Sequence, residues 1–334
     1  MRFLLDDEQR EFARTLDAML TAADTPGAAR AWAAGDHAPG HAVWSRLADA
    51  GVFALPVPEE YEGVGPLPVE MAVSFIELGR HAVPGPVVET VAAGALLTRL
   101  AGLGDAAPAK RLLASVASGE AITTLALPEG GPFALDADSA TLRLASGDGE
   151  LRLASGHARV ERSLDPARRL ARLRPGELLA SGPSVTEASR YAADWASLAT
   201  AAQALGVGLA LLDRTVAYVK QRTQFGTPIG GFQAVKHRLA DVLMSLEFAR
   251  PLVFGAALTL RTADMAAAKV AASEAAYGAA RAALQLHGAI GYTAEYDLSL
   301  WLTKARALRG AWGSPGECRR LVMSGVRGAG RPGE

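Results

Sequence analysis

Apolar residues recur at helical spacing through the first third of the chain. Leu5, Phe12, Leu16 and Leu20 begin the pattern, which continues in further segments to about residue 118 and is typical of amphipathic helices. Prolines and glycines between positions 56 and 66 interrupt it, so we expect a loop there. The pattern predicts an all-helical N-terminal domain over residues 1–119.

The spacing of apolar residues changes to two between about residues 121 and 182. Leucines alternate with other residues in the segments ATLRLAS and ELRLASG, which is the pattern of half-buried β-strands. Gly147, Asp148 and Gly149 lie between the two segments and have the composition of a tight hairpin turn. Four prolines further disfavour helices in this part of the chain. We expect a small β-domain over residues 120–183.

Helical spacing returns from about residue 184, and apolar residues again form seams along each segment. The first seam consists of Leu198, Ala202, Leu205, Leu209, Leu212, Val216 and Val219. The third segment is rich in alanine, and its seam consists of Met265, Ala268, Ala272, Ala276, Ala279 and Ala283. Small residues of this kind let neighbouring helices approach closely. With two further segments, the last ending near Gly310, residues 184–334 are predicted to form a four-helix bundle, and the whole chain an α+β fold.

The charge balance argues against several classes of partner. A formal net charge of -1, with no local basic tract, gives no field that would attract nucleic acid or an anionic membrane. The N-terminus lacks the basic and apolar regions of a secretion signal, and no uninterrupted apolar run of about 18 residues occurs. We therefore expect a cytoplasmic protein that binds a small molecule or another protein.

Cysteine is used once, at Cys318. A single cysteine excludes an internal disulfide and any metal cluster built from several thiolates, which fits a reducing cytosol. One interpretation of Cys318 is a reactive thiol, and the more common one is an ordinary buried or interfacial cysteine. The sequence predicts no metal site.

Two motifs in the last domain make the interpretation specific. The segments QRTQFGTPIGGFQ, residues 221–233, and QLHGAIGYTAEY, residues 285–296, resemble the two flavin-contacting signatures of acyl-CoA dehydrogenases. The order of a helical domain, a β-domain and a helical bundle also resembles that family, so the resemblance covers essentially the whole chain. It implies that the protein uses FAD to remove a proton and a hydride from an acyl-CoA thioester.

The residue types in these motifs suit a dinucleotide. The pyrophosphate of FAD needs a cation and N–H donors, and the guanidinium of Arg222 offers a fixed fork of donors. Gly288 and Gly291 let the backbone approach a cofactor without a Cβ atom, and Phe225 offers an apolar face to a ring. The resemblance assigns flavin contact to Arg222, Gln224, Phe225, Gln233, Gln285, Leu286, His287, Gly288 and Ala289. The alternative for each of these residues is helix packing or capping.

Both positions at which the family carries its catalytic base hold residues that cannot act as one. In most members a Glu follows the fourth bundle helix, and the matching segment RGAWGSPGECRRLV places Gly313 there. In other members the Glu precedes an Arg near the start of the first bundle helix, where this chain has Ala196 and Ser197. Neither Gly nor Ala can abstract a proton. Glu317 is the nearest carboxylate, about one helical turn further on, and is more simply a helix-end residue beside two arginines.

The strands that would line the flavin ring also depart from the family. The usual Thr-Glu-Pro and Gly-Ser-Asp strand corresponds here to TTLALPEGGPFALDAD, of which Pro128 and Glu129 match, and we find no Trp-Ile-Thr equivalent. Flavin motifs without a base resemble one subunit of the heteromeric α2β2 acyl-CoA dehydrogenases of actinobacterial steroid catabolism. This resemblance implies a second acyl-CoA dehydrogenase subunit as partner, which carries the catalytic Glu and the ring-binding pocket.

Three hypotheses follow. The chain completes the FAD site of a partner subunit; or it is a self-sufficient homotetrameric dehydrogenase whose base is Glu317 or Asp194; or it is a flavin-free scaffold that retains the fold. The acyl group of the substrate stays open at this point. A steroid-derived thioester is implied by the resemblance alone, and a polyketide or branched-chain acyl group is an alternative.

Overall fold

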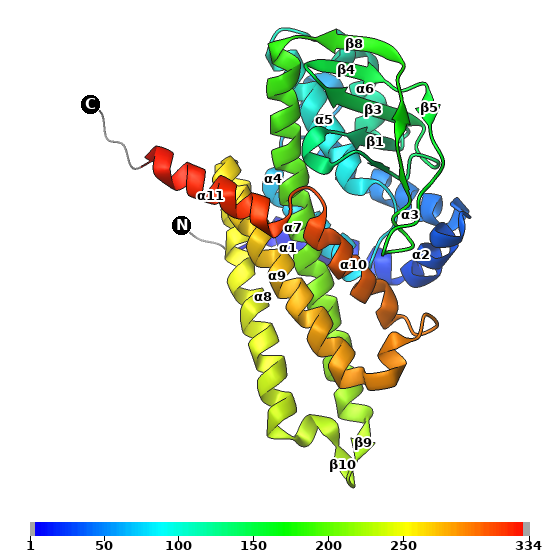
Figure 1. The fold of residues 1–334 in the computed structure, drawn as a ribbon, viewed down its shortest axis with the longest axis vertical. Coiled ribbons are helices and arrows are strands. Elements are labelled where there is room, and N and C mark those ends of the chain that lie inside the picture. Colours follow the sequence, from blue (N-terminus) through cyan, green and yellow to red (C-terminus); the bar gives the residue numbers. More distant parts are fainter. Residues whose placement is uncertain (1–3, 330–334) are drawn as a thin grey trace.

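The computed structural model describes residues 4–329, and its N-terminal part is helical as the spacing predicts (Figure 1). The helices are α1 (Asp7–Thr21), α2 (Thr25–Ala34), α3 (Ala38–Asp49), α4 (Pro68–Arg80), α5 (Val87–Gly102) and α6 (Ala107–Ala117), with short 3-10 turns η1 (Val52–Ala54) and η2 (Glu59–Tyr61). The loop expected from the prolines and glycines lies between α3 and α4. A capping box between Asp6 and Gln9 explains where α1 begins.

A small sheet occupies the middle of the chain. It consists of β1 (Thr123–Ala126), β3 (Leu142–Gly147), β4 (Glu150–Leu153) and β8 (Glu177–Ser181), in the order β1-β3-β4-β8. Strands β3 and β4 form the predicted hairpin, in which Gly147 pairs with Glu150. Asp148 and Gly149 form its turn with φ values of 53° and 74°, a conformation that Asp and Gly tolerate best. The turn chemistry therefore sets the register that buries Leu144 and Leu151 on one face.

Shorter elements complete the middle region. They are η3 (Pro128–Gly130), β2 (Ala134–Leu135), β5 (Gly156–His157), β6 (Leu170–Ala171) and β7 (Leu173–Arg174). Strand β2 pairs with β6 and β5 with β7, both antiparallel. These two-residue ladders extend the region beyond the four-stranded sheet.

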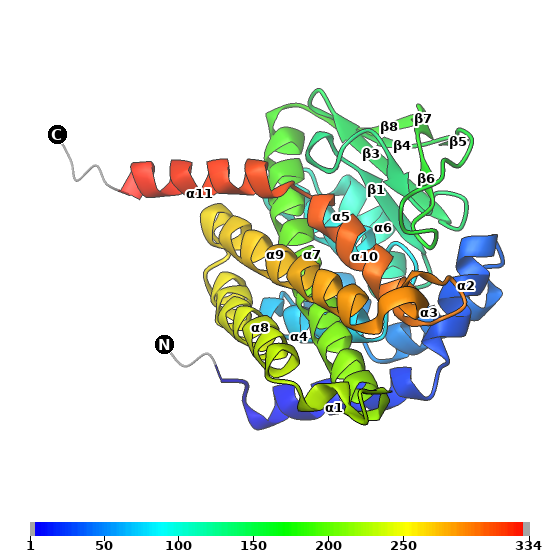
Figure 2. The ribbon, with the colours of Figure 1, turned by 60° about the horizontal axis from the view of Figure 1, so that its bottom comes forward.

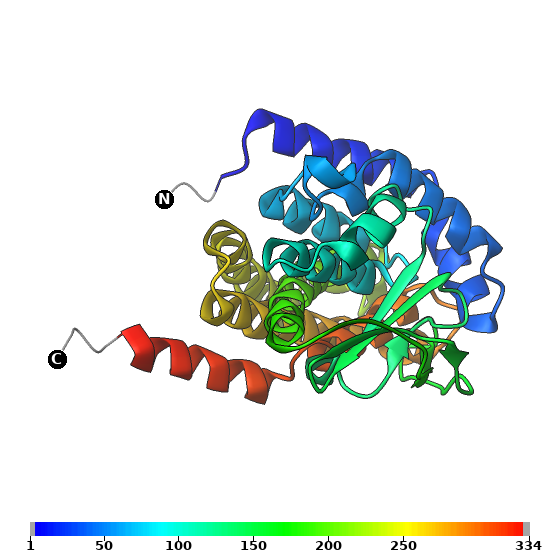
Figure 3. The ribbon, with the colours of Figure 1, turned by 90° about the horizontal axis from the view of Figure 1, so that it is seen from above.

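The C-terminal part contains one helix more than the four predicted. Its helices are α7 (Pro183–Gln221), α8 (Gln233–Thr259), α9 (Thr262–His287), α10 (Leu298–Gly310) and α11 (Pro315–Ala329), with η4 (Ile229–Gly231), η5 (Gly288–Tyr292), β9 (Thr223–Gln224) and β10 (Thr227–Pro228) between them. The added helix is α11, which extends away from the body in Figures 1 and 3. Its start is set by Ser314 and Glu317, whose side chains each bond the other residue's backbone N–H.

Helix α7 is the centre of the molecule. It packs against α4, α5, α8, α9 and α10, so its middle turns are buried on every side and not along one seam as predicted. The crossing with α4 depends on glycine, because a Cβ atom at Gly206 would lie 1.9 Å from the carbonyl oxygen of Ile76. The predicted alanine seam of α9 is buried as expected, which lets α9 lie beside α7 and α8 (Figure 2).

Helices α7 and α8 are each long and apolar enough to cross a membrane by composition alone. The apolar window of α7 is 100% buried within the protein and that of α8 is 39% buried. Complete burial is what the core helix of a globular fold shows. One hydrophobic cluster joins Leu16 of α1, Leu144 of β3 and Trp195 of α7, so the three parts of the chain share one core.

Candidate functional site

The first flavin motif forms the elbow between α7 and α8, at the tip of the molecule where β9 and β10 lie in Figure 1. Gln224 pairs with Thr227 across this small hairpin, and Phe225 and Gly226 turn the chain with φ values of 52° and 75°. A non-glycine residue at positive φ is uncommon and strained. The side chain of Phe225 is 94% exposed, so the elbow holds an aromatic ring away from the protein's own core.

Arg222 and the start of α8 give the elbow the chemistry of an anion site. Arg222 caps the end of α7, is exposed, and makes no ion pair within residues 4–329. Helix α8 begins at Gln233, also exposed, and Phe232 before it provides no side-chain cap. Uncapped N–H groups at a helix start attract negative charge, as does a guanidinium. These residues fit the pyrophosphate of a dinucleotide.

The second motif lies at the same end of the bundle. The ring of Tyr218, one turn before the elbow, stacks on His287 at 4.1 Å and so joins the end of α7 to the end of α9. Gln285, Gly288 and Ala289 are exposed. Gly288 has a φ of 64° and open space where a Cβ atom would stand, so its backbone is accessible to a ligand. The structure therefore brings the two motifs together, as the resemblance requires.

His287 and Leu286 differ from their neighbours in this motif. His287 is buried between Tyr218 and Tyr296, and its Nδ1–H donates to the carbonyl of Ala283 at 2.8 Å. Burial lowers the pKa of His287, so the imidazole is neutral at pH 7. Leu286 is half-buried. The side chain of His287 packs inside the bundle, and its carbonyl accepts from the Tyr218 hydroxyl at 3.4 Å, so flavin contact at this position stays a prediction.

A cavity of about 480 Å³ lies toward the other end of α7, between α7, α9, α11 and η3. It brings together Gly313, Asp194 and Glu317, three of the positions considered for a base, and Ser197, which matches the position of the family's Arg. Ala196 is completely buried in the core and does not line it. Cys318 lines the cavity too, as do three residues that the sequence did not single out: Arg190, Thr262 and Trp312. They escaped notice because they belong to three separate segments.

Asp194 is one of three carboxylates that line this cavity, with Glu129 and Glu317. It is half-buried, and Thr262 Oγ1 donates to its Oδ2 at 2.7 Å. Burial raises the pKa of Asp194, the hydrogen bond from Thr262 opposes that rise, and the nearby charge of Glu129 adds to it. A carboxylate with a raised pKa accepts protons more readily than an ordinary one.

Glu317 has the opposite character. Its carboxylate is exposed and accepts hydrogen bonds from Ser314 Oγ at 2.6 Å and from the Ser314 N–H at 2.8 Å. These two bonds hold the pKa of Glu317 below its usual value. The prediction of a helix-end residue is confirmed, because both oxygen contacts serve the cap of α11.

Buried polar contacts support the cavity wall at the α10–α11 turn. Trp312 Nε1 donates to Glu89 Oε1 at 3.0 Å, and burial raises the pKa of Glu89, against the opposing charge of Arg168. The Lys269 ammonium donates to the carbonyls of Leu308 at 2.9 Å and Gly313 at 3.2 Å. Burial lowers the pKa of Lys269 to about 8. The turn is therefore held from two sides.

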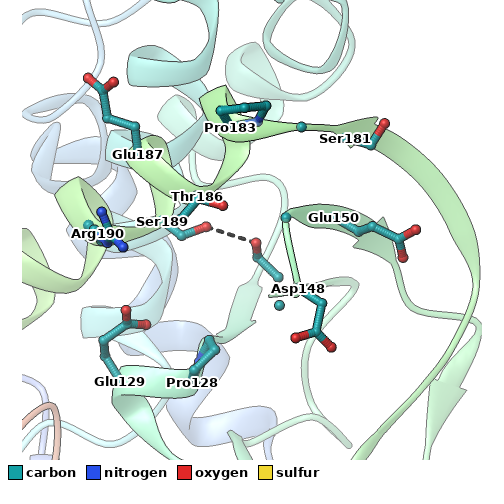
Figure 4. A pocket seen from close by; sticks show the side chains of 14 residues that line it. Pro128, Glu129, Asp148, Glu150, Ser181, Pro183, Thr186, Glu187, Ser189 and Arg190 are labelled. Atoms are coloured by element: carbon teal, nitrogen blue, oxygen red, sulfur yellow. Dashed lines mark hydrogen bonds between the residues drawn. The ribbon is translucent and has the colours of Figure 1, made fainter.

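A second cavity, of about 830 Å³, adjoins the first and shares Glu129 and Arg190 with it. It lies between η3, the β3–β4 hairpin and the first turns of α7 (Figure 4). In this view Asp148 projects from the hairpin and Arg190 from α7, while Ser189 bonds Ser146 at 2.8 Å. The surviving Pro128-Glu129 fragment thus stands at the border of the two cavities.

One group of potential metal ligands occurs among the described residues, away from both motifs. Ligand atoms of Asp17, Glu77 and His81 all lie within 4.8 Å of one another. His81 Nε2 is 2.8 Å from Asp17 Oδ1, and Arg80 Nε is 3.6 Å from Glu77 Oε2. The hydrogen bond between α1 and the end of α4 and the charge pair within α4 account for this group.

The chain belongs to the acyl-CoA dehydrogenase family. Residues 6–120 match the family's N-terminal domain and residues 186–325 match its C-terminal domain. The expected fold is confirmed, and the class is that of oxidoreductases acting on CH–CH bonds.

One relative and two solved structures are similar to nearly the whole chain. The acyl-CoA dehydrogenase IpdE2 of Mycobacterium tuberculosis is 36% identical over 96% of this chain and 98% of its own length. Among solved structures, a variant of the Tcur3481-Tcur3483 steroid ACAD has a TM-score of 0.82 at 23% identity, covering 97% of this chain and 99% of that one. The ChsE4-ChsE5 complex from Mycobacterium tuberculosis has a TM-score of 0.81 at 22% identity and covers 100% of both chains.

Proposed function

We propose that this chain is the subunit of a cytoplasmic acyl-CoA dehydrogenase that clasps FAD for a second subunit. Arg222, Gln233 and Gln285 hold the pyrophosphate and adenine side of the cofactor, while the partner supplies the ring-binding pocket and the catalytic Glu. FAD, when bound, accepts the hydride removed from the acyl-CoA thioester. The observation that carries the proposal is the separation of the exposed flavin motifs from this chain's own cavity.

That separation follows from a single continuous helix. Asp194 and Arg222 are 28 positions apart along α7, which corresponds to about 42 Å at 1.5 Å per residue. One flavin clasped at the elbow therefore cannot place its ring in the cavity beside Asp194. The ring must lie against another chain, and the exposed Phe225 and Arg222 are free to face it.

The vacant base positions support the same division of labour. Gly313 lines the cavity without a side chain, and Ala196 points into the core, so neither provides a proton acceptor. A relative solved as the ChsE4-ChsE5 complex supports a heteromeric assembly, and the steroid ACAD neighbour supports a steroid-derived thioester as substrate. A homo-oligomer is the alternative assembly.

Co-expression with a catalytic acyl-CoA dehydrogenase subunit tests the proposal. We expect the chain to purify without stoichiometric flavin on its own, and the complex to contain one FAD for every two chains. Flavin is measured by its absorbance after denaturation of the purified protein. Full FAD occupancy and acyl-CoA oxidation by the chain alone would overturn the proposal.

A self-sufficient dehydrogenase is the second candidate, and the position of Asp194 favours it. This half-buried carboxylate with a raised pKa lines the cavity that also contains Gly313. If Asp194 is the base, Asp194→Asn abolishes flavin reduction by acyl-CoA, whereas the matched variant Glu317→Gln retains it. Unchanged turnover in Asp194→Asn removes this candidate.

A further inference from the structure

We infer that the α10–α11 turn is closed to any side chain at position 313, and that Cys318 and Lys269 are the positioning residues that keep it closed. A single substitution at position 313 would then not restore the base, because the surrounding turn requires glycine there.

The backbone is the first reason. Gly313 has a φ of 108°, and Trp312 before it has a φ of 51°. A residue with a side chain rarely adopts a φ of 108°, whereas glycine does so without strain. Two successive residues at positive φ reverse the chain between the end of α10 and the start of α11.

Lack of space is the second reason. A Cβ atom at position 313 would lie 2.8 Å from Cys318 Sγ, closer than two such atoms approach in proteins. Cys318 is 2% exposed and stands on the first turn of α11, which the Ser314–Glu317 cap holds in place. A side chain at position 313 would therefore have to displace this sulfur or shift the turn itself.

The third reason is that the turn cannot swing away. Lys269 Nζ bonds the carbonyls of Leu308 and Gly313, and Glu89 bonds the indole of Trp312. Lys269 and Glu89 belong to α9 and α5, which are core helices, so both ties have rigid supports. Gly130 adds a further limit, because the ring of Trp312 packs against its backbone.

A consequence for catalysis rests on the proposed function. If the partner supplies the base, this chain does not regain one by Gly313→Glu, since the new side chain would have to displace α11 before it could reach a substrate. We expect Gly313→Glu to show no acyl-CoA oxidation on its own.

The single cysteine provides a direct test on the full chain, without flavin or turnover. In the wild type we expect slow reaction of Cys318 with a disulfide reagent such as dithiobis(nitrobenzoate), because the thiol is buried. Gly313→Ala should accelerate that reaction at least tenfold. The matched control is Gly316→Ala in the same segment, where a Cβ atom meets open space, and it should leave the rate unchanged. Lys269→Met should accelerate it as well when rates are compared per thiolate, because burial raises the pKa of Cys318 and the Lys269 charge opposes that rise.

Denaturant unfolding separates the effect of the contact with Cys318 from the effect of backbone strain at position 313. Gly313→Ala should raise the unfolding equilibrium constant about tenfold or more, and the same substitution made in a Cys318→Ala background should raise it less. The residual effect measures the backbone strain. An unchanged thiol rate and unfolding midpoint in Gly313→Ala, or oxidation activity in Gly313→Glu alone, would overturn the inference. The thiol rate and the unfolding midpoint are measured without flavin, so neither depends on FAD stoichiometry or on the partner.

Discussion

The residues near the two ends of α7 differ in exposure and in hydrogen bonding. At the elbow Arg222 is exposed and makes no ion pair within the described residues, and Phe225 is exposed at a positive φ with only Phe232 beside its ring. At the α10–α11 turn Trp312 and Lys269 are buried and tied to named carbonyl and carboxylate groups. Exposed residues on a loop that a rigid scaffold holds in a defined geometry are often binding residues. Polar groups that are hydrogen-bonded within the protein stabilise its structure. Here they stabilise a cavity wall that contains no catalytic base.

The largest expected effect concerns the buried cation at the turn. Lys269 has a pKa near 8 in the folded chain and 10.5 as its ordinary value, so between these pH values the unfolded chain binds more protons. The free energy of unfolding therefore gains from Lys269 as pH rises through this window, by on the order of 3 kcal/mol. Lys269→Met should remove that gain. Urea unfolding from pH 7 to 10.5 measures the difference between the two curves.

An exposed lysine is the control for this prediction. Lys110→Met should leave the pH dependence of unfolding as it is in the wild type, because Lys110 is exposed on α6. If Lys269→Met gains stability with pH just as the wild type does, the ammonium is not buried in solution and the comparison of the two ends fails.

The next effect tests the elbow. Arg222→Ala should weaken FAD binding by the assembled complex roughly 10- to 100-fold, because a hydrogen-bonded charge is worth about 1.5–3 kcal/mol. Arg222→Lys should fall between, since it keeps the charge and loses the fork of donors. Titration of the apo-complex with FAD gives the dissociation constants. Lys220→Ala, an exposed cation on the last turn of α7, should change FAD affinity less than twofold, and an equal loss there would point to general electrostatics.

A smaller effect separates capping from catalysis. Glu317→Ala should lower the free energy of unfolding by about 1 kcal/mol, because it removes the reciprocal cap of α11. Reduction of flavin by acyl-CoA in the complex should be unaffected. Both quantities can be measured on one preparation, by urea unfolding and by bleaching of the flavin absorbance. Loss of flavin reduction with normal stability would instead make Glu317 a base.

The smallest effect on the chain itself is expected at Phe225. This ring is 94% exposed, so Phe225→Ala should change the free energy of unfolding of the isolated chain by less than about 0.5 kcal/mol. Its consequence should appear only in the complex, as weaker FAD binding or weaker association with the partner. A large loss of stability in the isolated chain would show that the elbow serves its own fold.

Local sequence patterns predict several of these features. The hairpin turn at Asp148, the alanine seam of α9 and the helix-end role of Glu317 follow from spacing and capping chemistry, which depend on neighbouring residues. Helix α11 was missed even though Ser314 and Glu317 form a recognisable capping box.

By itself, the sequence determined that the chain alternates helical and strand regions, that it carries both flavin motifs, and that Gly313 and Ala196 cannot be bases. Only the tertiary structure decided that Ala196 points into the core, that His287 is covered, and that Asp194 shares a cavity with Gly313. The physical reason is distance along the chain. Burial and pairing arise between segments such as those of Glu89 and Trp312, which are 223 residues apart, and no periodic pattern records such a contact.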